Sequence, residues 1–151
     1  MKILADNKKG LFDYSIQEKV EAGIVLSGQE VKSVRAGLAQ LKGSYISTQG
    51  NELSLINCHI PKYAKATQVR DYLPTHSRKL LLHKKEIFRI IGQLSAKGLT
   101  LIPVCIYSKG SKIKVEVGLA KSKKKADKKA AIKSRDIGRS MQREIADYDF
   151  D

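Results

Sequence analysis

Apolar side chains occupy every second position along much of residues 12–26, where the even-numbered positions are mostly apolar. Successive side chains of a strand point to opposite faces, so this period of two predicts one long strand with a buried face. Gly23 lies within the run and indicates a bulge or a bend in that strand.

A short helix with clear signals at both ends is predicted directly after this strand. Ser27 and Glu30 have the spacing of a capping box, in which the side chain of each accepts a hydrogen bond from the backbone N–H of the other. Val31 and Val34 share one face, and Gly37 suits the left-handed turn that ends a helix. Since so short a helix needs tertiary support, we expect it to cover one end of a sheet or barrel.

Two antiparallel strand pairs are predicted further along the chain. The strand-like segments 44–47 and 53–60 are joined by a Gly-Asn turn that is favourable in hairpins. Residues 99–107 are apolar on both faces, with Pro103 indicating a sheet edge or a bulge. Residues 112–119 alternate between apolar and charged side chains, so we expect one face of that strand in the core and the other to be basic.

Between these pairs the chain is predicted to form a long loop and then a second helix. Residues 61–77 have no sustained periodicity, and their cations alternate with Tyr63 and Tyr72. Such a composition suits phosphate neutralisation with base stacking, while the alternative is that the tyrosines pack the loop onto the body. Residues 78–83 are expected to form a short strand or turn that leads into a helix ending at Gly98.

This order of elements favours a mainly β fold. A helix inserted late in an antiparallel series suggests a small closed antiparallel β-barrel of the OB-like type, with two or three short helices, over residues 1–120. Residues 121–151 form a basic C-terminal tail, which we expect to be disordered alone because it has too few apolar side chains to bury. Ile137, Met141 and Ile145 share a helical face, so the tail is expected to become helical on RNA; the alternative is a permanently solvated tail.

The charge of the chain points to a polyanionic partner. Lysine and arginine number 29 against 15 acidic residues, a formal net charge of +14. Residues 121–143 hold 10 basic and 2 acidic side chains, whereas residues 1–120 hold 19 and 9, so the tail is electrostatically distinct. We therefore expect a nucleic acid ahead of an anionic membrane. No apolar run approaches the roughly 20 residues that span a bilayer, and the first residues lack the core of a signal peptide, so we expect a cytoplasmic protein without a membrane partner.

No constellation of residues that would support catalysis or metal binding is visible. The three histidines lack the spacing of a metal site, and Cys58 and Cys105 lie in apolar segments typical of buried free thiols. We therefore predict no enzyme, no metal and no cofactor. For Glu30 two assignments stay open, a capping-box partner and a functional residue.

Several runs of the sequence together resemble one known family. The two most specific are 28–37 (GQEVKSVRAG) and 78–83 (RKLLLH), and the others are 7–9, 13–14, 21–26, 44–45, 119–121 and 123–124. Their order and spacing are similar to those of the small protein B (SmpB) family, the SsrA-binding proteins that partner bacterial transfer-messenger RNA. The resemblance spans nearly the whole chain.

The resemblance implies a division of labour between body and tail. In the family an OB-like barrel grips the tRNA-like domain of transfer-messenger RNA, and the basic tail enters the decoding centre and the empty mRNA channel of a stalled ribosome. It implies trans-translation by tRNA mimicry, that is, ribosome rescue with tagging of the incomplete peptide for degradation. The peptide chemistry then belongs to the ribosome, and a monomer is expected on the RNA.

Two sets of candidate residues follow from the resemblance and the basic character of the chain. The RNA-binding set is Asn7, Lys8, Glu30, Lys32, Arg35, Lys79, His83 and Lys121. The ribosome-binding set in the tail is Lys123, Lys124, Asp127, Lys128, Lys133 and Arg135. Recognition of the RNA is expected to rely on its backbone and shape rather than on a base-reading motif.

Two other function classes stay open at the level of composition. A structural ribosomal or general RNA-binding OB protein fits the composition equally well. An RNA-modifying or RNA-cleaving enzyme is disfavoured because the sequence shows no catalytic site. The RNA that co-purifies with the protein would separate the first of these from a rescue factor.

Overall fold

The computed structural model describes residues 1–63 and 71–123, in which a series of strands is interrupted by helices. In chain order the elements are β1 (Lys2–Asp6), α1 (Lys8–Leu11), β2 (Tyr14–Ile24), α2 (Gly28–Arg35), β3 (Tyr45–Gln49), β4 (Glu52–Ile56), β5 (Arg78–Leu81), α3 (Lys84–Lys97), β6 (Thr100–Lys109) and β7 (Lys112–Ser122). The predicted long strand, capped helix, two strand pairs and second helix are thus confirmed, while β1 and α1 have no counterpart among the predicted elements.

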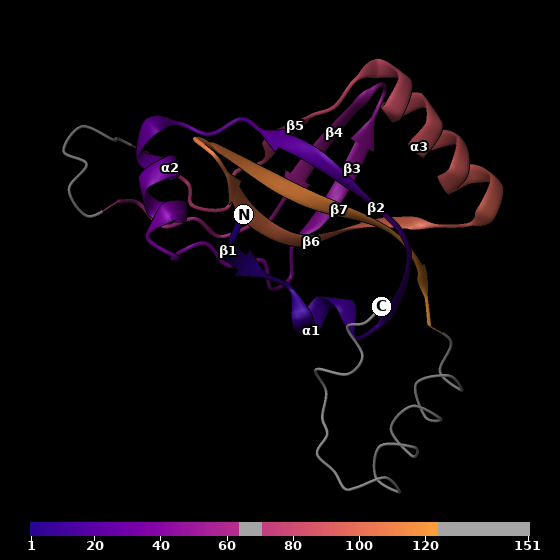
Figure 1. The fold of residues 1–151 in the computed structure, drawn as a ribbon, viewed down its shortest axis with the longest axis horizontal. Helices are drawn as coiled ribbons and strands as arrows, with labels where there is room; N and C mark the ends of the chain where they lie inside the picture. The colour runs from indigo at the N-terminus through magenta and orange to yellow at the C-terminus, as the bar shows by residue number, and fades with distance from the viewer. Residues whose placement is uncertain (64–70, 124–151) are drawn as a thin grey trace, which may run out of the picture.

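The strands of the described residues form one antiparallel sheet of seven strands. They pair in the order β1-β6-β7-β2-β5-β4-β3, so the three longest strands lie next to one another. In Figure 1, β3 and β4 cross the long strands β6 and β7, with α2 at one end of the molecule and α3 at the other. The sheet therefore curls around a core to which β2, β4, β5, β6 and β7 all contribute side chains.

The expected closed barrel is not confirmed. In the described ranges β1 and β3 are the two edge strands, and no hydrogen-bonded ladder joins them. Closure of a barrel requires every strand to pair on both sides, and β1 and β3 each pair on one side only. The pairing inside the sheet is also short at one point, since β5 meets β2 over only two residue pairs, Gly23–Leu81 and Ile24–Leu80. The curled shape is instead held by side-chain packing across the interior, where β3 contacts β6.

Strand β6 is covered on both faces, as its sequence predicts. All residues from Leu101 to Tyr107 are buried. Leu101 and Ile106 join the main core, and Tyr107 packs on the other face in a smaller cluster with Leu11 of α1. The pairing of β6 with β7 shifts register between Pro103 and Cys105, so the proline occupies a bulge, one of the two positions that the sequence indicates for it.

Strand β2 follows the predicted alternation, but its bulge lies at another position than the predicted one. Val20 and Ala22 are buried. The register against β7 shifts between Ile16 and Glu18 rather than at Gly23. A Cβ atom on Gly23 would lie 3.3 Å from Cβ of Leu81, so the glycine allows β5 to approach closely where it crosses β2.

Candidate nucleic-acid interface

Helix α2 has both terminal signals that the sequence predicts. The backbone N–H of Ser27 donates to Oε1 of Glu30 over 2.9 Å, and that of Glu30 donates to Oγ of Ser27 over 3.3 Å, which completes the capping box. Gly37 follows the helix with φ of +79°. Val34 is fully buried, whereas Lys32 and Arg35 are exposed. The helix thus anchors its apolar side and presents two cations.

Glu30 is the centre of a buried polar network as well as a cap. Its side chain is almost completely buried, and Oε2 accepts hydrogen bonds from Arg78 Nε at 2.8 Å, His76 Nε2 at 2.7 Å and the Tyr72 hydroxyl at 3.1 Å. Burial alone would raise the pKa of Glu30, but the hydrogen bonds from Ser27, Arg78 and His76 outweigh it and lower that pKa to about 2. Glu30 is therefore ionised and lies beneath the surface.

Arg78 is the cation that makes this burial possible. Its side chain is fully inside the protein, where it donates to the carbonyl oxygens of Cys58 at 2.7 Å, Pro74 at 2.8 Å and His76 at 3.1 Å in addition to Glu30. A buried charge is tolerated when it is paired and its donors are satisfied. Arg78 thereby ties the start of β5 to the first turn of α2.

The described ends of the predicted loop are fixed to α2. Oγ of Ser33 donates to the carbonyl of Pro61 over 2.8 Å, and Oε1 of Gln29 accepts from the backbone N–H of Tyr63 over 2.8 Å. The Lys32 ammonium lies 5.8 Å from the centroid of the Tyr63 ring, within range of a cation–π contact. These contacts agree with tyrosines that pack the loop onto the body, and a role in base stacking stays a prediction.

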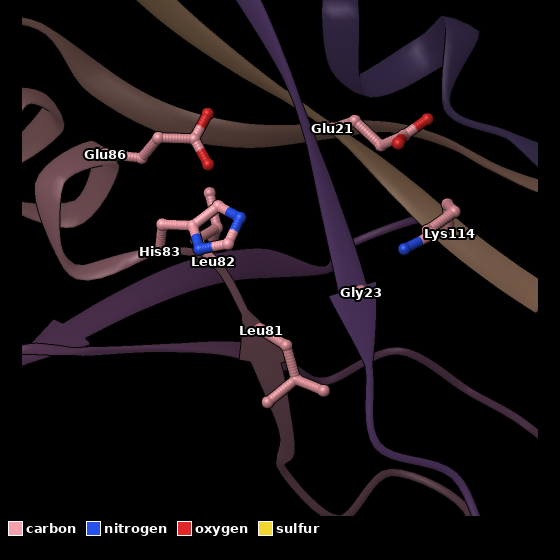
Figure 2. Close-up of a pocket in the computed structure, with 7 residues that line it drawn as sticks. All are labelled: Glu21, Gly23, Leu81, Leu82, His83, Glu86 and Lys114. Carbon is pink, nitrogen blue, oxygen red and sulfur yellow. The ribbon is translucent and has the colours of Figure 1, made fainter.

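An open pocket of about 440 Å³ lies between the sheet and the start of α3. It is lined by Glu21, Gly23, Leu81, Leu82, His83, Glu86 and Lys114. Figure 2 shows that these residues come from β2, from β5 and the turn after it, from the first turn of α3 and from β7. Carboxylates, an imidazole, an ammonium group and an exposed leucine thus surround one depression, a mixture that suits a nucleotide better than a purely apolar ligand.

Glu21 is held in place from outside the pocket. The buried Tyr107 hydroxyl donates to its Oε2, and Lys109 Nζ lies 3.4 Å from Oε1 and 3.3 Å from Oε2. The hydrogen bond from Tyr107 lowers the pKa of Glu21 most strongly, against a smaller opposing effect of desolvation. The carboxylate is therefore ionised and acts as an acceptor.

The structure distributes the predicted RNA-binding residues over three places. Lys79 on β5 is exposed and its ammonium lies 3.3 Å from Glu52, and His83 lines the pocket. Lys32 and Arg35 project from α2, where Arg35 also donates to the carbonyl of Ser111 over 2.8 Å. The third place is the surroundings of α1, at the lower edge of the sheet in Figure 1.

Around α1, only part of the predicted set is exposed. Asn7 is buried, and its Nδ2 donates to the carbonyl of Pro103 over 2.8 Å, so it joins α1 to β6. Lys8 is exposed on α1, and Lys121 is exposed on β7 opposite Ser15 of β2. Asn7 and Glu30 are thus both buried, each at its own place in the fold, while the lysines are exposed.

Of the predicted tail set, only Lys123 belongs to the described residues. Its backbone N–H donates to the carbonyl of Asp13 over 3.0 Å, and its ammonium lies 5.8 Å from the Phe12 ring centroid. The other members lie outside the described residues: Lys124, Asp127, Lys128, Lys133 and Arg135.

Four residues that shape these sites are not among the predicted site residues: Glu21, Arg78, Tyr107 and Lys114. Glu21 and Arg78 lie within runs that carry the family resemblance, and Lys114 lies on the face that was expected to be basic. Arg78 lies 48 residues from its partner Glu30, and Tyr107 lies 86 residues from its partner Glu21, so no local pattern in the sequence could reveal either pair.

The cysteines are buried free thiols, as predicted. Burial raises the pKa of Cys58 to about 11 and that of Cys105 to about 12, which makes both poor nucleophiles. Within residues 1–63 and 71–123, no cluster of His, Cys, Asp and Glu is arranged to hold a metal ion. None of the helices in these ranges combines the length and apolar character needed to cross a membrane.

Comparison with known proteins places the chain close to one family. The model of the family described as "SmpB protein" matches residues 4–147. The SsrA-binding protein of Sulfurihydrogenibium sp. (strain YO3AOP1) is 47% identical over 142 residues, which cover 94% of this chain and 93% of the relative. The SsrA-binding protein of Rickettsia bellii (strain OSU 85-389) is 50% identical over 145 residues, 95% of each chain.

A solved structure is similar as well. It is described as "tmRNA-SmpB: a journey to the center of the bacterial ribosome", and its matching chain is 43% identical with a TM-score of 0.62. The match covers 80% of this chain and 88% of the other.

Proposed function

The chain belongs to the SmpB family, and from this premise we propose that it binds the tRNA-like domain of transfer-messenger RNA and delivers it to stalled ribosomes. The delivery serves trans-translation, in which the ribosome is rescued and the incomplete peptide is tagged for degradation. The observation that carries the proposal is the near-complete alignment with SsrA-binding proteins, which leaves hardly any of this chain unmatched.

The protein acts as a binding factor in the cytoplasm and not as an enzyme. The peptide transfer belongs to the ribosome, and the OB-like curled sheet supplies only a surface. Support comes from the family, from the buried and weakly reactive thiols, and from side chains suited to contacting RNA without transforming it. A monomer on each RNA molecule suffices for this role.

The RNA face lies on the exposed side chains of the predicted set. Lys32 and Arg35 on α2, and Lys79 on β5 with the neighbouring His83, contact phosphates and ribose groups. Structured RNA is recognised largely through its shape and its backbone, and a curled sheet with exposed cations on β5 and on the adjoining α2 matches that requirement. Glu30 supports this face from below by fixing α2 to the loop ends.

The tail serves the ribosome, and Lys8 and Lys121 beside its start belong to the RNA face. Lys121 and Lys123 stand at the point where the body ends, and residues 121–143 carry the densest positive charge of the chain. We assign residues 1–120 to binding of transfer-messenger RNA and residues 121–151 to the decoding centre and mRNA channel. Lys8 lies near the junction, because Lys121 pairs with the start of β2, directly after α1.

The decisive experiment is to sequence the RNA that co-purifies with the full-length protein from its native cells. A single dominant RNA with a tRNA-like end is expected. Ribosomal RNA or a broad mixture would instead support a general RNA-binding protein and overturn the proposal. Binding of the purified protein to a transcript of the tRNA-like domain, with an ordinary tRNA as competitor, gives the quantitative form of the same test at physiological salt.

A further inference from the structure

The last residues of the sequence carry a charge opposite to that of the segment before them. Residues 144–151 (EIADYDFD) hold four acidic side chains and no basic one, directly after the strongly basic residues 121–143. Phosphates repel carboxylates, so this acidic segment adds nothing to the attraction of RNA. The match to the family model ends at residue 147, so family membership does not account for residues 148–151.

Within the acidic segment, aspartates and aromatic residues alternate. Asp147, Asp149 and Asp151 are separated by Tyr148 and Phe150. In an extended peptide successive side chains point to opposite sides, so this alternation gives one side with two rings and another with three carboxylates. A matching surface needs an apolar lining and unpaired cations beside it.

An open groove of about 540 Å³ at the start of α1 has both properties. This α1 groove lies between the end of β1, the first turn of α1 and the segment that joins α2 to β3. Apolar side chains line it, and the ammonium groups beside them are exposed. The residues concerned are Leu4, Ala39 and Leu41, and Lys8, Lys9 and Lys42.

The α1 groove has a surplus of positive charge. Within residues 1–63 and 71–123, none of its three lysines forms an ion pair, and its one carboxylate belongs to Asp6. The pocket at the start of α3 differs, because Glu21 and Glu86 there outnumber Lys114. An acidic peptide is therefore attracted to the α1 groove rather than to that pocket.

The acidic segment is able to reach the α1 groove of its own chain. The backbone N–H of Lys123, the last described residue, donates to the carbonyl of Asp13, and its ammonium lies 5.8 Å from the Phe12 ring centroid, so the chain leaves the body beside α1. Figure 1 shows the end of β7 and α1 on the same, lower side of the molecule. A flexible peptide as long as residues 124–146 has a root-mean-square end-to-end distance of about 25 Å. Tethering over such a length gives an effective concentration on the order of millimolar, so a weak contact is sufficient.

We propose that residues 144–151 bind in the α1 groove of their own chain when RNA is absent, with the two rings on its apolar lining and the aspartates beside its lysines. The bound segment covers Lys8 of the proposed RNA face. An RNA that needs Lys8 must displace it, so weak complexes with unrelated RNA become rarer while a tight complex persists. This consequence rests on the proposed function, whereas the contact itself does not.

Carbodiimide cross-linking of the full-length protein measures the contact, because it joins a carboxylate to a lysine that touches it. Mass spectrometry is expected to find residues 144–151 joined to Lys8, Lys9 or Lys42. A mixture of isotope-labelled and unlabelled protein should give no mixed cross-links, and a transcript of the tRNA-like domain should suppress the cross-links.

A double variant, Tyr148→Ser with Phe150→Ser, separates docking from simple attraction of charges. It keeps every carboxylate and lysine, so we expect it to lose the cross-links to the α1 groove and to bind a single-stranded poly(U) probe about threefold more tightly at physiological salt. Tyr148→Phe retains the ring and is the matched control, which should behave like the unmodified protein. Circular dichroism verifies that both variants are folded.

Three results would overturn the inference. Cross-links confined to the lysines of residues 121–143 would mean that the acidic segment pairs with the tail, and mixed cross-links would mean that it binds a second copy. Unchanged cross-linking and poly(U) binding in the double variant would mean that the rings have no part. Each result leaves the proposed function standing, because the preference of the unmodified protein for the tRNA-like domain over an ordinary tRNA tests that function separately. Loss of this preference would contradict the proposed function and would leave the cross-links in the absence of RNA unaffected.

Discussion

At the scale of single residues, Glu30 shows how one side chain serves two structural purposes. One carboxylate oxygen caps α2, and the other receives three donors from residues 72–78. The capping role is apparent from a spacing of three residues, but the second role depends on chain segments more than 40 residues away. The capping-box assignment is thus confirmed, and a direct contact between Glu30 and RNA would require the buried network to open.

Glu30→Gln is expected to lower the free energy of unfolding by about 3–5 kcal/mol at neutral pH, the cost of removing one partner of a buried ion pair. Arg78 would remain buried without its countercharge. Glu52→Gln is the matched control, because its partner Lys79 lies at 3.3 Å in an exposed pair worth less than about 1 kcal/mol. Denaturant unfolding followed by circular dichroism measures both. Equal losses in the two variants would contradict the buried network.

The same network makes stability depend on pH in a defined range. The pKa of Glu30 is lowered from 4.5 to about 2 in the folded protein, so protons bind more tightly to the unfolded chain. The stabilisation by Glu30 is therefore complete above pH 4.5 and is lost as the pH falls towards 2. Glu30→Gln should show a flatter decline of stability across this interval than the unmodified protein.

At the scale of elements, α2 organises the surface although it has only eight residues. Its capping box sets its start, Ser33 and Gln29 hold the first end of the loop, and Glu30 holds the second. Arg35 reaches Ser111 in the turn between β6 and β7. A helix this short is not stable alone and derives its order from tertiary contacts. Its exposed cations are therefore presented on a rigid support.

Lys32→Glu is expected to weaken binding of the tRNA-like domain about tenfold or more at physiological salt, because a phosphate contact becomes a repulsion. Lys97→Glu makes the same charge change at the far end of α3 and is the control. Filter binding or fluorescence titration measures the affinities, and circular dichroism verifies that both variants are folded. Equal weakening by the two variants would mean that net charge alone, and not the α2 face, attracts the RNA.

At the scale of the whole molecule, charge and packing separate the chain into two parts. The body buries its apolar side chains between a curled sheet and its helices. Residues 121–143 carry 10 basic side chains among few apolar ones, a composition suited to contacting polyanions rather than to forming a core. The proposed division of labour between RNA binding and ribosome binding follows this boundary.

Truncation after Lys123 tests that division. The shortened protein is expected to bind the tRNA-like domain within about threefold of the full-length protein, since the α2 face and the pocket are intact. Peptide tagging on stalled ribosomes in a reconstituted translation system should be lost. A truncated protein that still supports tagging, or one that no longer binds the RNA, would assign the two functions differently.

Local signals in the sequence were sufficient for most elements of the fold. Period-two alternation in β2 and β7, the capping box of α2 and the glycine after α3 depend on neighbours within one strand or turn, and all are confirmed. β1 and α1 lacked such signals. β1 is a five-residue edge strand, and α1 is a single turn tied to β6 through Asn7.

What the sequence determined by itself was the order of elements, the basic character and the family, because periodicity, composition and motifs are properties of the chain. Only the tertiary structure decided which strands became edges, which predicted RNA contacts lie under the surface, and which side chains line the pocket. The reason is that packing brings together groups far apart in sequence, as Tyr107 meets Glu21 across β7 and Arg78 meets Glu30 beneath α2. Such pairs follow from the register and curvature of the sheet, which no single segment encodes.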